Sequence, residues 1–140
     1  MKLKCILLID DDQITNFINK KILDNIDAAE HVFAVESGEE ALEYLTATGR
    51  YEGQQLSKPD LILLDINMPG IDGFEFIEKY KTLSGEQKGD VVVVMLTKSV
   101  FPHNEVRATS MSEISDFKYK PLTEELAREL VASYFYEKVH

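Results

Sequence analysis

Residues 60–73 read DLILLDINMPGIDG, and this stretch decides the fold. Leu61–Leu64 is continuously apolar, which is typical of a strand in a parallel sheet that helices cover on both faces. Asp65 follows this strand directly, and Asp72 is placed to cap a helix. The stretch therefore predicts a strand and then a helix, with an aspartate at the carboxyl end of the strand.

Four further apolar runs and four further helical patterns flank this stretch. One helix follows from Ile14, Phe17, Ile18 and Ile22, which recur at helical spacing. The others are expected to begin near Ser37, Pro102 and Thr123, and residues 49–58 form a surface loop. The four strands are expected at Lys4–Ile9, His31–Val35, Val91–Leu96 and Phe117–Tyr119, the last of these at an edge of the sheet.

Strict alternation of strands and helices predicts an α/β fold, a doubly wound parallel sheet of five strands with five helices. Right-handed crossovers place the carboxyl end of every strand on the same edge of the sheet. The 140 residues suit one domain, so residues 1–140 are expected to form a single unit without an output domain.

Composition excludes several classes of protein. The net charge of −10 repels phosphate backbones, so direct binding to nucleic acid is not expected. The single cysteine, Cys5, allows no internal disulfide and is expected in the core. The apolar run that begins at Cys5 is too short for a signal peptide, and no run approaches the roughly 20 residues that cross a bilayer. These features predict a cytoplasmic protein that is not inserted in a membrane.

Chemically active side chains follow the predicted strands. Residues 10–12 are three aspartates after the first strand, and Asp65, Thr97 and Lys120 follow the third, fourth and fifth. Ligands of open α/β sheets bind outside the carboxyl ends of the strands, so these groups are expected to converge. Clustered carboxylates repel one another unless a cation lies among them, and Mg²⁺ prefers such oxygen ligands. The cluster predicts phosphoryl transfer to Asp65, with Lys120 and Thr97 compensating charge on the phosphoryl oxygens.

Each of these signals is weak by itself. A lone aspartate after a strand is usually a turn residue or a helix cap, and Asp12 is expected to cap the first helix. A lone threonine is also more often a cap, and a Lys-Pro step is more often an ordinary strand end. The prediction depends on their joint occurrence in this order.

Four sequence blocks stand out, namely ILLIDDD at 6–12, DLILLDINMPGIDG at 60–73, VMLT at 94–97 and FKYKP at 117–121. Together they resemble the receiver domains of two-component response regulators. The resemblance covers nearly the whole chain and implies the CheY-like, flavodoxin-like sheet with strand order 2-1-3-4-5. It also implies a phosphoacceptor that receives its phosphoryl group from a sensor histidine kinase or a phosphotransfer protein.

The resemblance implies a role for each matching residue. Asp65 matches the phosphorylated aspartate, and Lys120 matches the lysine that pairs with the phosphoryl group. Thr97 matches the switch hydroxyl, and Phe117 matches the aromatic residue that rotates inward with it. The implied Mg²⁺ ligands are Asp10 through water, and Asp11, Asp65 and the backbone carbonyl of Asn67 directly.

The implied output is a change of shape that is read by a downstream protein or passed on by phosphotransfer. A diffusible regulator and a phosphorelay intermediate remain open, because they share one site. The surface implied for output includes Lys118, Glu125 and Arg128. Lys98 departs from the family pattern, which has a small residue there; it either shields the phosphoryl group or extends into solvent.

Two rivals come from other classes of protein. A phosphatase of the haloacid-dehalogenase type also uses an aspartate and Mg²⁺, but it needs an acid two residues after the nucleophile, where this chain has Asn67. A pseudo-receiver would keep the fold as a binding module and lack an acid or the lysine, and neither is missing here. The sequence therefore favours a signalling domain over an enzyme.

Overall fold

The computed structural model describes residues 2–83, 85, 91–98 and 101–139, and it contains one parallel sheet of five strands. Their order is β2-β1-β3-β4-β5, and every neighbouring pair is parallel. Each predicted strand is present, with bounds that shift by two residues at most. The strands are β1 Leu3–Ile9, β2 Ala29–Val35, β3 Leu61–Leu64, β4 Val92–Thr97 and β5 Asp116–Tyr119.

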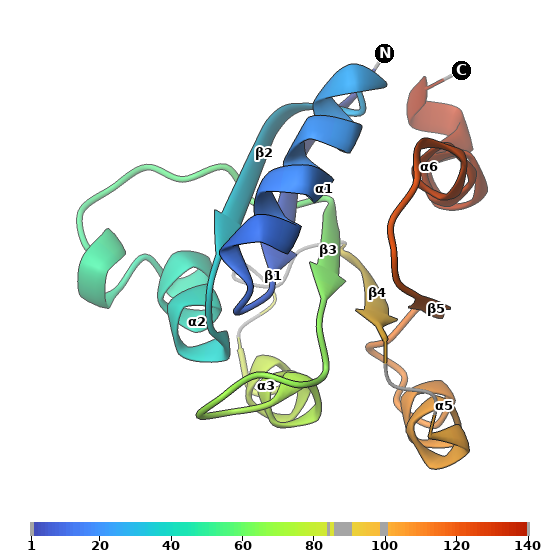
Figure 1. Cartoon of the computed structure of the whole chain (residues 1–140). Helices are drawn as coiled ribbons and strands as arrows, with labels where there is room; N and C mark the ends of the chain where they lie inside the picture. The colour runs from blue at the N-terminus through green and yellow to red at the C-terminus, as the bar shows by residue number, and fades with distance from the viewer. Residues whose placement is uncertain (1, 84, 86–90, 99–100, 140) are drawn as a thin grey trace.

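Helices cover both faces of the sheet (Figure 1). Two separate apolar clusters lie between the sheet and its two layers of helices, because alternate strand residues such as Leu7 and Leu8 point to opposite faces. The strand order and the two layers confirm the doubly wound, flavodoxin-like prediction. One face carries α1 Gln13–Asn25 and α6 Glu124–Val139, and the other carries α2 Gly38–Thr46, α3 Gly73–Tyr80 and α5 Pro102–Thr109.

The predicted caps fix where the helices begin. Asp12 accepts a hydrogen bond from the Ile14 N–H, which confirms its expected role as the cap of α1. Asp72 and Glu75 form a reciprocal capping box at the start of α3. Thr123 accepts from the Leu126 N–H at the start of α6. These caps set the points at which the chain leaves the strand ends and turns into each helix.

Three of the four apolar residues that predicted α1 do not face the sheet, whereas the fourth, Ile22, packs partly against the core. Ile14, Phe17 and Ile18 are 69%, 62% and 50% exposed, whereas Asn16 and Asn19 are buried. The spacing of apolar residues marks one side of a helix, but it does not say what covers that side. Leu23 packs into the core, and the asparagines occupy the sheet-facing side nearest the strand ends. Among the helices that the structure describes, none has the length and apolarity needed to cross a bilayer.

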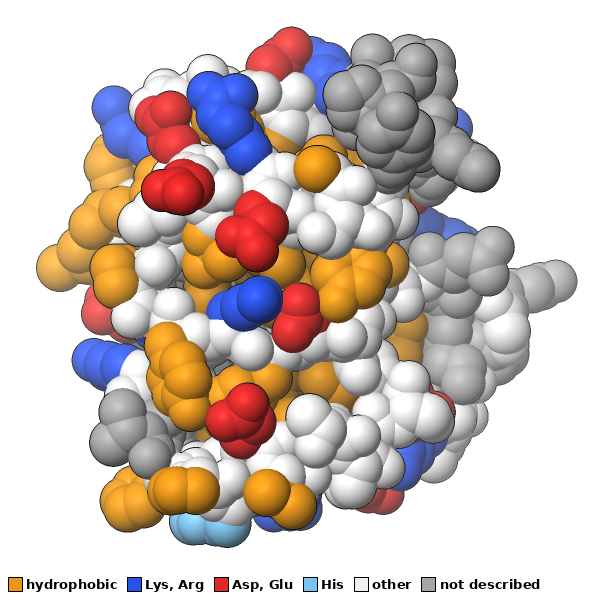
Figure 2. All heavy atoms as spheres, turned by 90° about the vertical axis from the view of Figure 1, so that its right-hand side faces the viewer, with side chains coloured by type: hydrophobic (Ala, Val, Ile, Leu, Met, Phe, Trp, Pro, Cys, Tyr) orange, Lys and Arg blue, Asp and Glu red, His pale blue; other side chains and the backbone are white. Residues whose placement is uncertain are grey.

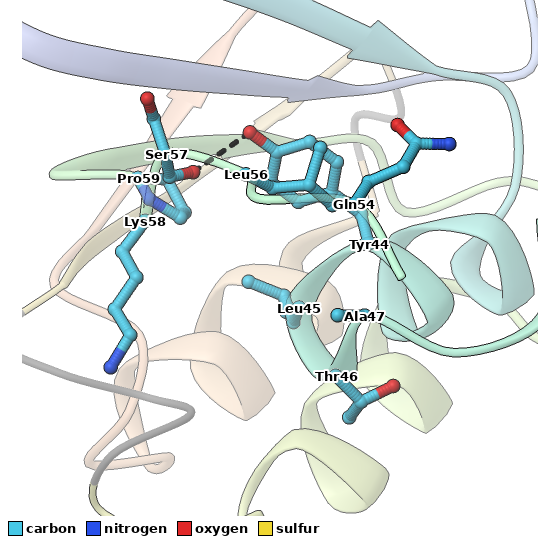
Figure 3. A pocket seen from close by; sticks show the side chains of 9 residues that line it. All are labelled: Tyr44, Leu45, Thr46, Ala47, Gln54, Leu56, Ser57, Lys58 and Pro59. Carbon is cyan, nitrogen blue, oxygen red and sulfur yellow. Dashed lines mark hydrogen bonds between the residues drawn. The ribbon is translucent and has the colours of Figure 1, made fainter. Parts of the chain in front are cut away.

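The predicted surface loop at residues 49–58 begins with a short 3-10 helix, η1 Gly49–Tyr51. Tyr51 is buried and its hydroxyl donates to Glu40 Oε2 at 2.6 Å. A cavity of about 310 Å³ lies between the end of α2 and residues 54–59. The Tyr44 hydroxyl at this cavity donates to the Ser57 carbonyl oxygen at 2.8 Å, and Figure 3 shows the residues that line it. This cavity borders the segment that enters β3, so it lies at the opposite edge of the sheet from Asp65.

Candidate functional site

The strand register brings the predicted polar residues to one edge of the sheet. Ile9 pairs with Leu64, and Leu64 pairs with Met95, so β1, β3 and β4 end close together. Asp10 and Asp65 each follow one of these ends, and their side chains are buried, with Asp65 only 6% exposed. The Asp65 N–H donates to the Ile9 carbonyl oxygen at 2.9 Å, which extends the sheet hydrogen bonding to the aspartate itself.

Three carboxylates gather at this edge. One oxygen from each of Asp10, Asp11 and Asp65 lies within 4.8 Å of the other two. Asp10 and Asp65 are buried and Asp11 is exposed, so the cluster opens to solvent on the Asp11 side. Hard carboxylate oxygens at this spacing fit a divalent cation such as Mg²⁺, which also retains bound water.

Lys120 joins the two buried carboxylates. Its Nζ lies 2.5 Å from Asp10 Oδ2 and 3.4 Å from Asp65 Oδ1. Burial by itself would lower the pKa of Lys120, but the hydrogen bond to Asp10 and the charge of Asp65 outweigh it and raise that pKa. The ammonium group therefore stays charged at neutral pH and supplies a fixed positive charge beside Asp65.

Burial dominates the ionisation of Asp65. It raises the pKa of this carboxyl to about 6, because the nearby charge of Asp10 adds to the effect and Lys120 only partly opposes it. The carboxylate is thus ionised at neutral pH but is poorly stabilised in that form. A cation or a covalent partner that relieves its charge is favoured, which suits a carboxylate that acts as a nucleophile.

The loop after Asp65 is held against the site by Gly73. The Gly73 N–H donates to the Ile66 carbonyl oxygen at 2.8 Å. A Cβ atom on Gly73 would lie 2.5 Å from the Asp65 carbonyl oxygen and 2.9 Å from Ile66 Cα. Only glycine permits this approach, so the start of α3 is packed directly on the backbone of the candidate phosphoacceptor.

The two predicted switch residues, Thr97 and Phe117, are both buried. Thr97 ends β4 and is fully buried, and its carbonyl oxygen accepts from the Lys120 N–H at 2.8 Å. Phe117 is also buried, with its ring 5.5 Å from that of Tyr119. The structure thus shows Phe117 on the inside of the molecule. Asn67 lies in the loop two residues after Asp65, and its side chain is exposed.

Lys98 is exposed at the mouth of the site. Together with Lys120, Ile18 and Leu122 it lines a cavity of about 320 Å³ between α1 and the segment after β5. The pKa of Asp12 is lowered by the Thr15 hydroxyl and the Ile14 N–H, and the charge of Lys98 adds to this. Lys98 is therefore both exposed to solvent and near enough to Asp12 to add to the lowering of its pKa.

Comparison with known proteins identifies the family. The profile described as "Response regulator receiver domain" matches residues 6–132, which include every site residue named above. The chain belongs to the response regulator receiver domain family. It is accordingly a receiver domain of two-component signalling, and the members of this family are signalling domains.

Individual relatives agree with this assignment. A solved two-component response regulator from Cytophaga hutchinsonii is 34% identical, with a TM-score of 0.77 over 99% of this chain and 98% of that one. Two-component response regulator ARR15 of Arabidopsis thaliana is 31% identical over 84% of this chain and 55% of its own length. Response regulator Rcp1 of Synechocystis is 31% identical over 73% of this chain and 65% of its length. The solved Mn(2+)-bound form of Rcp1 has a TM-score of 0.71 at 24% identity, over 98% of this chain and 97% of that one.

The receiver spans little more than half of ARR15, and 12% of the sensor histidine kinase GacS of Pseudomonas protegens.

The sequence indicated the acids, Thr97 and Lys120 as site residues, but it did not indicate Asn16 or Gly73. A signal for Asn16 was present, because it lies on the opposite side of α1 from Ile14 and Ile18, close to the three aspartates. Nothing in the sequence signalled the contact between Gly73 and the backbone of Asp65.

Proposed function

We propose that Asp65 accepts a phosphoryl group from a phosphohistidine with the help of Mg²⁺, and that Thr97, Phe117 and Lys120 convert this event into a change of shape. The observation that carries the proposal is the cluster itself. Three carboxylates lie within 4.8 Å of one another, and Lys120 contacts the buried pair. A purely structural set of acids would not need a buried lysine beside a carboxylate whose pKa is raised to about 6.

Asp65 acts as the nucleophile. One of its carboxylate oxygens forms a bond to phosphorus while the bond from phosphorus to the donor's imidazole nitrogen breaks, and the electron pair leaves with that nitrogen. Mg²⁺ held by Asp10, Asp11, Asp65 and the Asn67 carbonyl oxygen would neutralise charge on the transferred group; the Mn(2+) form of Rcp1 offers a precedent. Lys120 is already 3.4 Å from Asp65 Oδ1 and takes a phosphoryl oxygen as its partner after transfer.

Conformational change then follows from the new charge. Thr97 is drawn toward the phosphoryl group, and the inward position of Phe117 is stabilised as the hydroxyl moves. Asn67 cannot serve as the general acid of a phosphatase, because an amide N–H is far too weakly acidic to transfer its proton, and this argues against the haloacid-dehalogenase alternative. Slow hydrolysis of the acyl phosphate by the receiver's own site would end the signal. We place these events in the cytoplasm and within one receiver domain.

Two surfaces of the receiver would contact other proteins. The donor docks on α1, because Ile14, Phe17 and Ile18 are exposed there and Ile18 borders the cavity that contains Lys98 and Lys120. The target reads the face formed by α5, β5 and α6, where Figure 2 shows hydrophobic side chains beside charged ones. The exposed hydrophobic residues of this face are Phe101, Val106, Tyr119 and Tyr134, and the charged residues include Lys118, Glu125 and Arg128.

Intact mass after incubation with acetyl phosphate and Mg²⁺ tests the proposal. We expect the mass of one phosphoryl group to be added, and we expect no gain for Asp65→Asn or in the presence of EDTA. Lys98→Ala is run in parallel, because a lysine at the mouth of the site can slow entry of a small donor. If neither the wild type nor Lys98→Ala gains mass while Mg²⁺ binds, the pseudo-receiver alternative replaces the proposal.

The docking surface on α1 gives a second prediction. A Phe17→Ser, Ile18→Ser double variant should slow transfer from a phosphorylated histidine kinase or phosphotransfer domain about tenfold or more, since exposed aromatic anchors contribute over 1 kcal/mol to binding. Uptake from acetyl phosphate should stay as in the wild type, because this donor needs no surface. Val106→Ser, equally exposed but on α5, is the matched control. Equal loss with both donors would show damage to the site rather than to docking.

A further inference from the structure

Two asparagines are buried on the side of α1 that faces the sheet. Asn16 is 5% exposed and Asn19 is 6% exposed, at positions one turn apart. A buried amide is unfavourable unless hydrogen bonds satisfy it, and apolar residues ordinarily occupy such positions. The same helix carries Ile14, Phe17 and Ile18 on its exposed side, so apolar side chains were available in this segment but face solvent instead. The buried amides therefore call for a specific role.

Asn16 ties the acidic loop to the neighbouring strand. Its Nδ2 group donates to the Asp10 carbonyl oxygen at 2.8 Å and to the Val35 carbonyl oxygen at 3.3 Å. Val35 also accepts from the Asp10 N–H at 3.2 Å. Both partners of the amide are carbonyl oxygens, so only its NH₂ group can face them. The chemistry of the partners thus fixes the orientation of the amide.

This contact restrains Asp11 as well as Asp10. The peptide unit that joins the two residues is planar, so the direction of the Asp10 carbonyl group sets the position of the Asp11 Cα atom. Asp11 is the exposed member of the three-carboxylate cluster. Through its hydrogen bond to the Asp10 carbonyl oxygen, the buried Asn16 side chain can therefore position the exposed carboxylate of Asp11.

The oxygen atom of the Asn16 amide, Oδ1, also needs a hydrogen-bond partner because it is buried. Asn16 Oδ1 is buried and has no hydrogen-bond partner in the part of the chain that the structure describes. A cavity of about 10 Å³ borders Asn16, Asn19, Asp65 and Lys120. A space of this size holds about one water molecule, and buried waters commonly satisfy polar groups of this kind.

We infer that Asn16 is a positioning residue for the metal-binding acids, and that its oxygen accepts a hydrogen bond from one water molecule in this cavity. The inference rests on the proposed function insofar as Asp10 and Asp11 bind Mg²⁺. Asn16 touches neither the cation nor the phosphoryl group. It acts through the backbone of the acidic loop, in the way that outer partners orient metal ligands at other sites.

Mg²⁺ affinity, measured by titration calorimetry on the unphosphorylated full chain, tests this inference. Asn16→Leu should weaken Mg²⁺ binding by about 10- to 100-fold, the range for loss of such a partner. Asn19→Leu is the matched control, because it removes an equally buried amide from the same helix without touching the Asp10 carbonyl; its affinity should stay within about threefold of the wild type. Urea unfolding in EDTA reports the stability of both variants separately.

The outcomes are distinct. An unchanged affinity for Asn16→Leu, or an equal loss for both variants, overturns the inference and leaves Asn16 with a purely structural role. If Asn16→Leu does not fold, Asn16→Ser serves instead, and its affinity should fall by a smaller factor that still exceeds that of Asn19→Leu. Failure of the wild type to bind Mg²⁺ would instead contradict the proposed function. A crystal structure with no water on Asn16 Oδ1 would overturn the second half of the inference.

Discussion

Replacing Gly73 with alanine should lower the free energy of unfolding by about 3 kcal/mol and abolish phosphoryl uptake by Asp65. The new Cβ would lie 2.5 Å from the Asp65 carbonyl oxygen and 2.9 Å from Ile66 Cα. Both atoms belong to the backbone, so no side chain can rotate away to make room. Either α3 moves outward and breaks the bond between the Gly73 N–H and the Ile66 carbonyl oxygen, or the loop that carries Asp65 shifts.

Urea unfolding and acetyl phosphate labelling measure the two parts of this prediction. Gly53→Ala is the control, because a Cβ at Gly53 meets no atom within 4 Å although the backbone has a φ of +78°. That variant should lose only about 1–2 kcal/mol, the strain of a left-handed residue, and should keep full labelling. A Gly73→Ala protein with wild-type stability and labelling would show that the contact is not maintained in solution.

Sequence predicted the fold because the signals for strands and their order are local. Runs such as Leu61–Leu64 are apolar throughout, and the rule for right-handed crossovers then places all strand ends on one edge. The convergence of Asp10, Asp65 and Lys120 follows from this rule without any knowledge of distances. The site could therefore be assembled from residue identity and position in the chain.

The remaining features depend on contacts between segments, which periodicity does not encode. Helical spacing identified the apolar side of α1 but not its exposure, because a surface that binds a partner has the same pattern as one that packs on a sheet. The burial of Tyr51 in a polar loop arises from its contacts with Tyr44 and Glu40. The approach of Gly73 to Asp65 likewise requires the path of the loop between them.

The raised pKa of Asp65 also could not be predicted from the sequence alone. Asp65 has an ordinary sequence context, but its burial and the charge of Asp10 together raise its pKa from 3.8 to about 6. The folded state therefore holds the proton of this carboxyl more tightly than the unfolded chain does. This difference links the stability of the receiver to pH and to the cation, and it can be measured without any phosphodonor.

In EDTA, Asp65→Asn should be more stable than the wild type at pH 7, by about 1–3 kcal/mol. Below pH 4 the wild-type carboxyl is protonated in both the folded and the unfolded chain, so its favourable contribution to stability is fully present. This contribution is lost as the pH rises from about 4 to about 6, because the unfolded chain releases the proton first. Asparagine is neutral at every pH, so the variant does not lose it.

Urea unfolding of both proteins at several pH values between 4 and 7 checks this prediction. The difference in unfolding free energy should shrink toward zero at the lower pH. Lys120 keeps Asp10 as a partner at 2.5 Å in the variant, so its charge is not left unpaired. Saturating Mg²⁺ should stabilise the wild type at pH 7 by about 3 kcal/mol at a hundred times its dissociation constant, and the variant by less. A variant less stable than the wild type at pH 7 in EDTA would mean that the ion pair of Asp65 with Lys120 outweighs burial; the carboxylate would then be stabilised before any cation or phosphoryl group arrives.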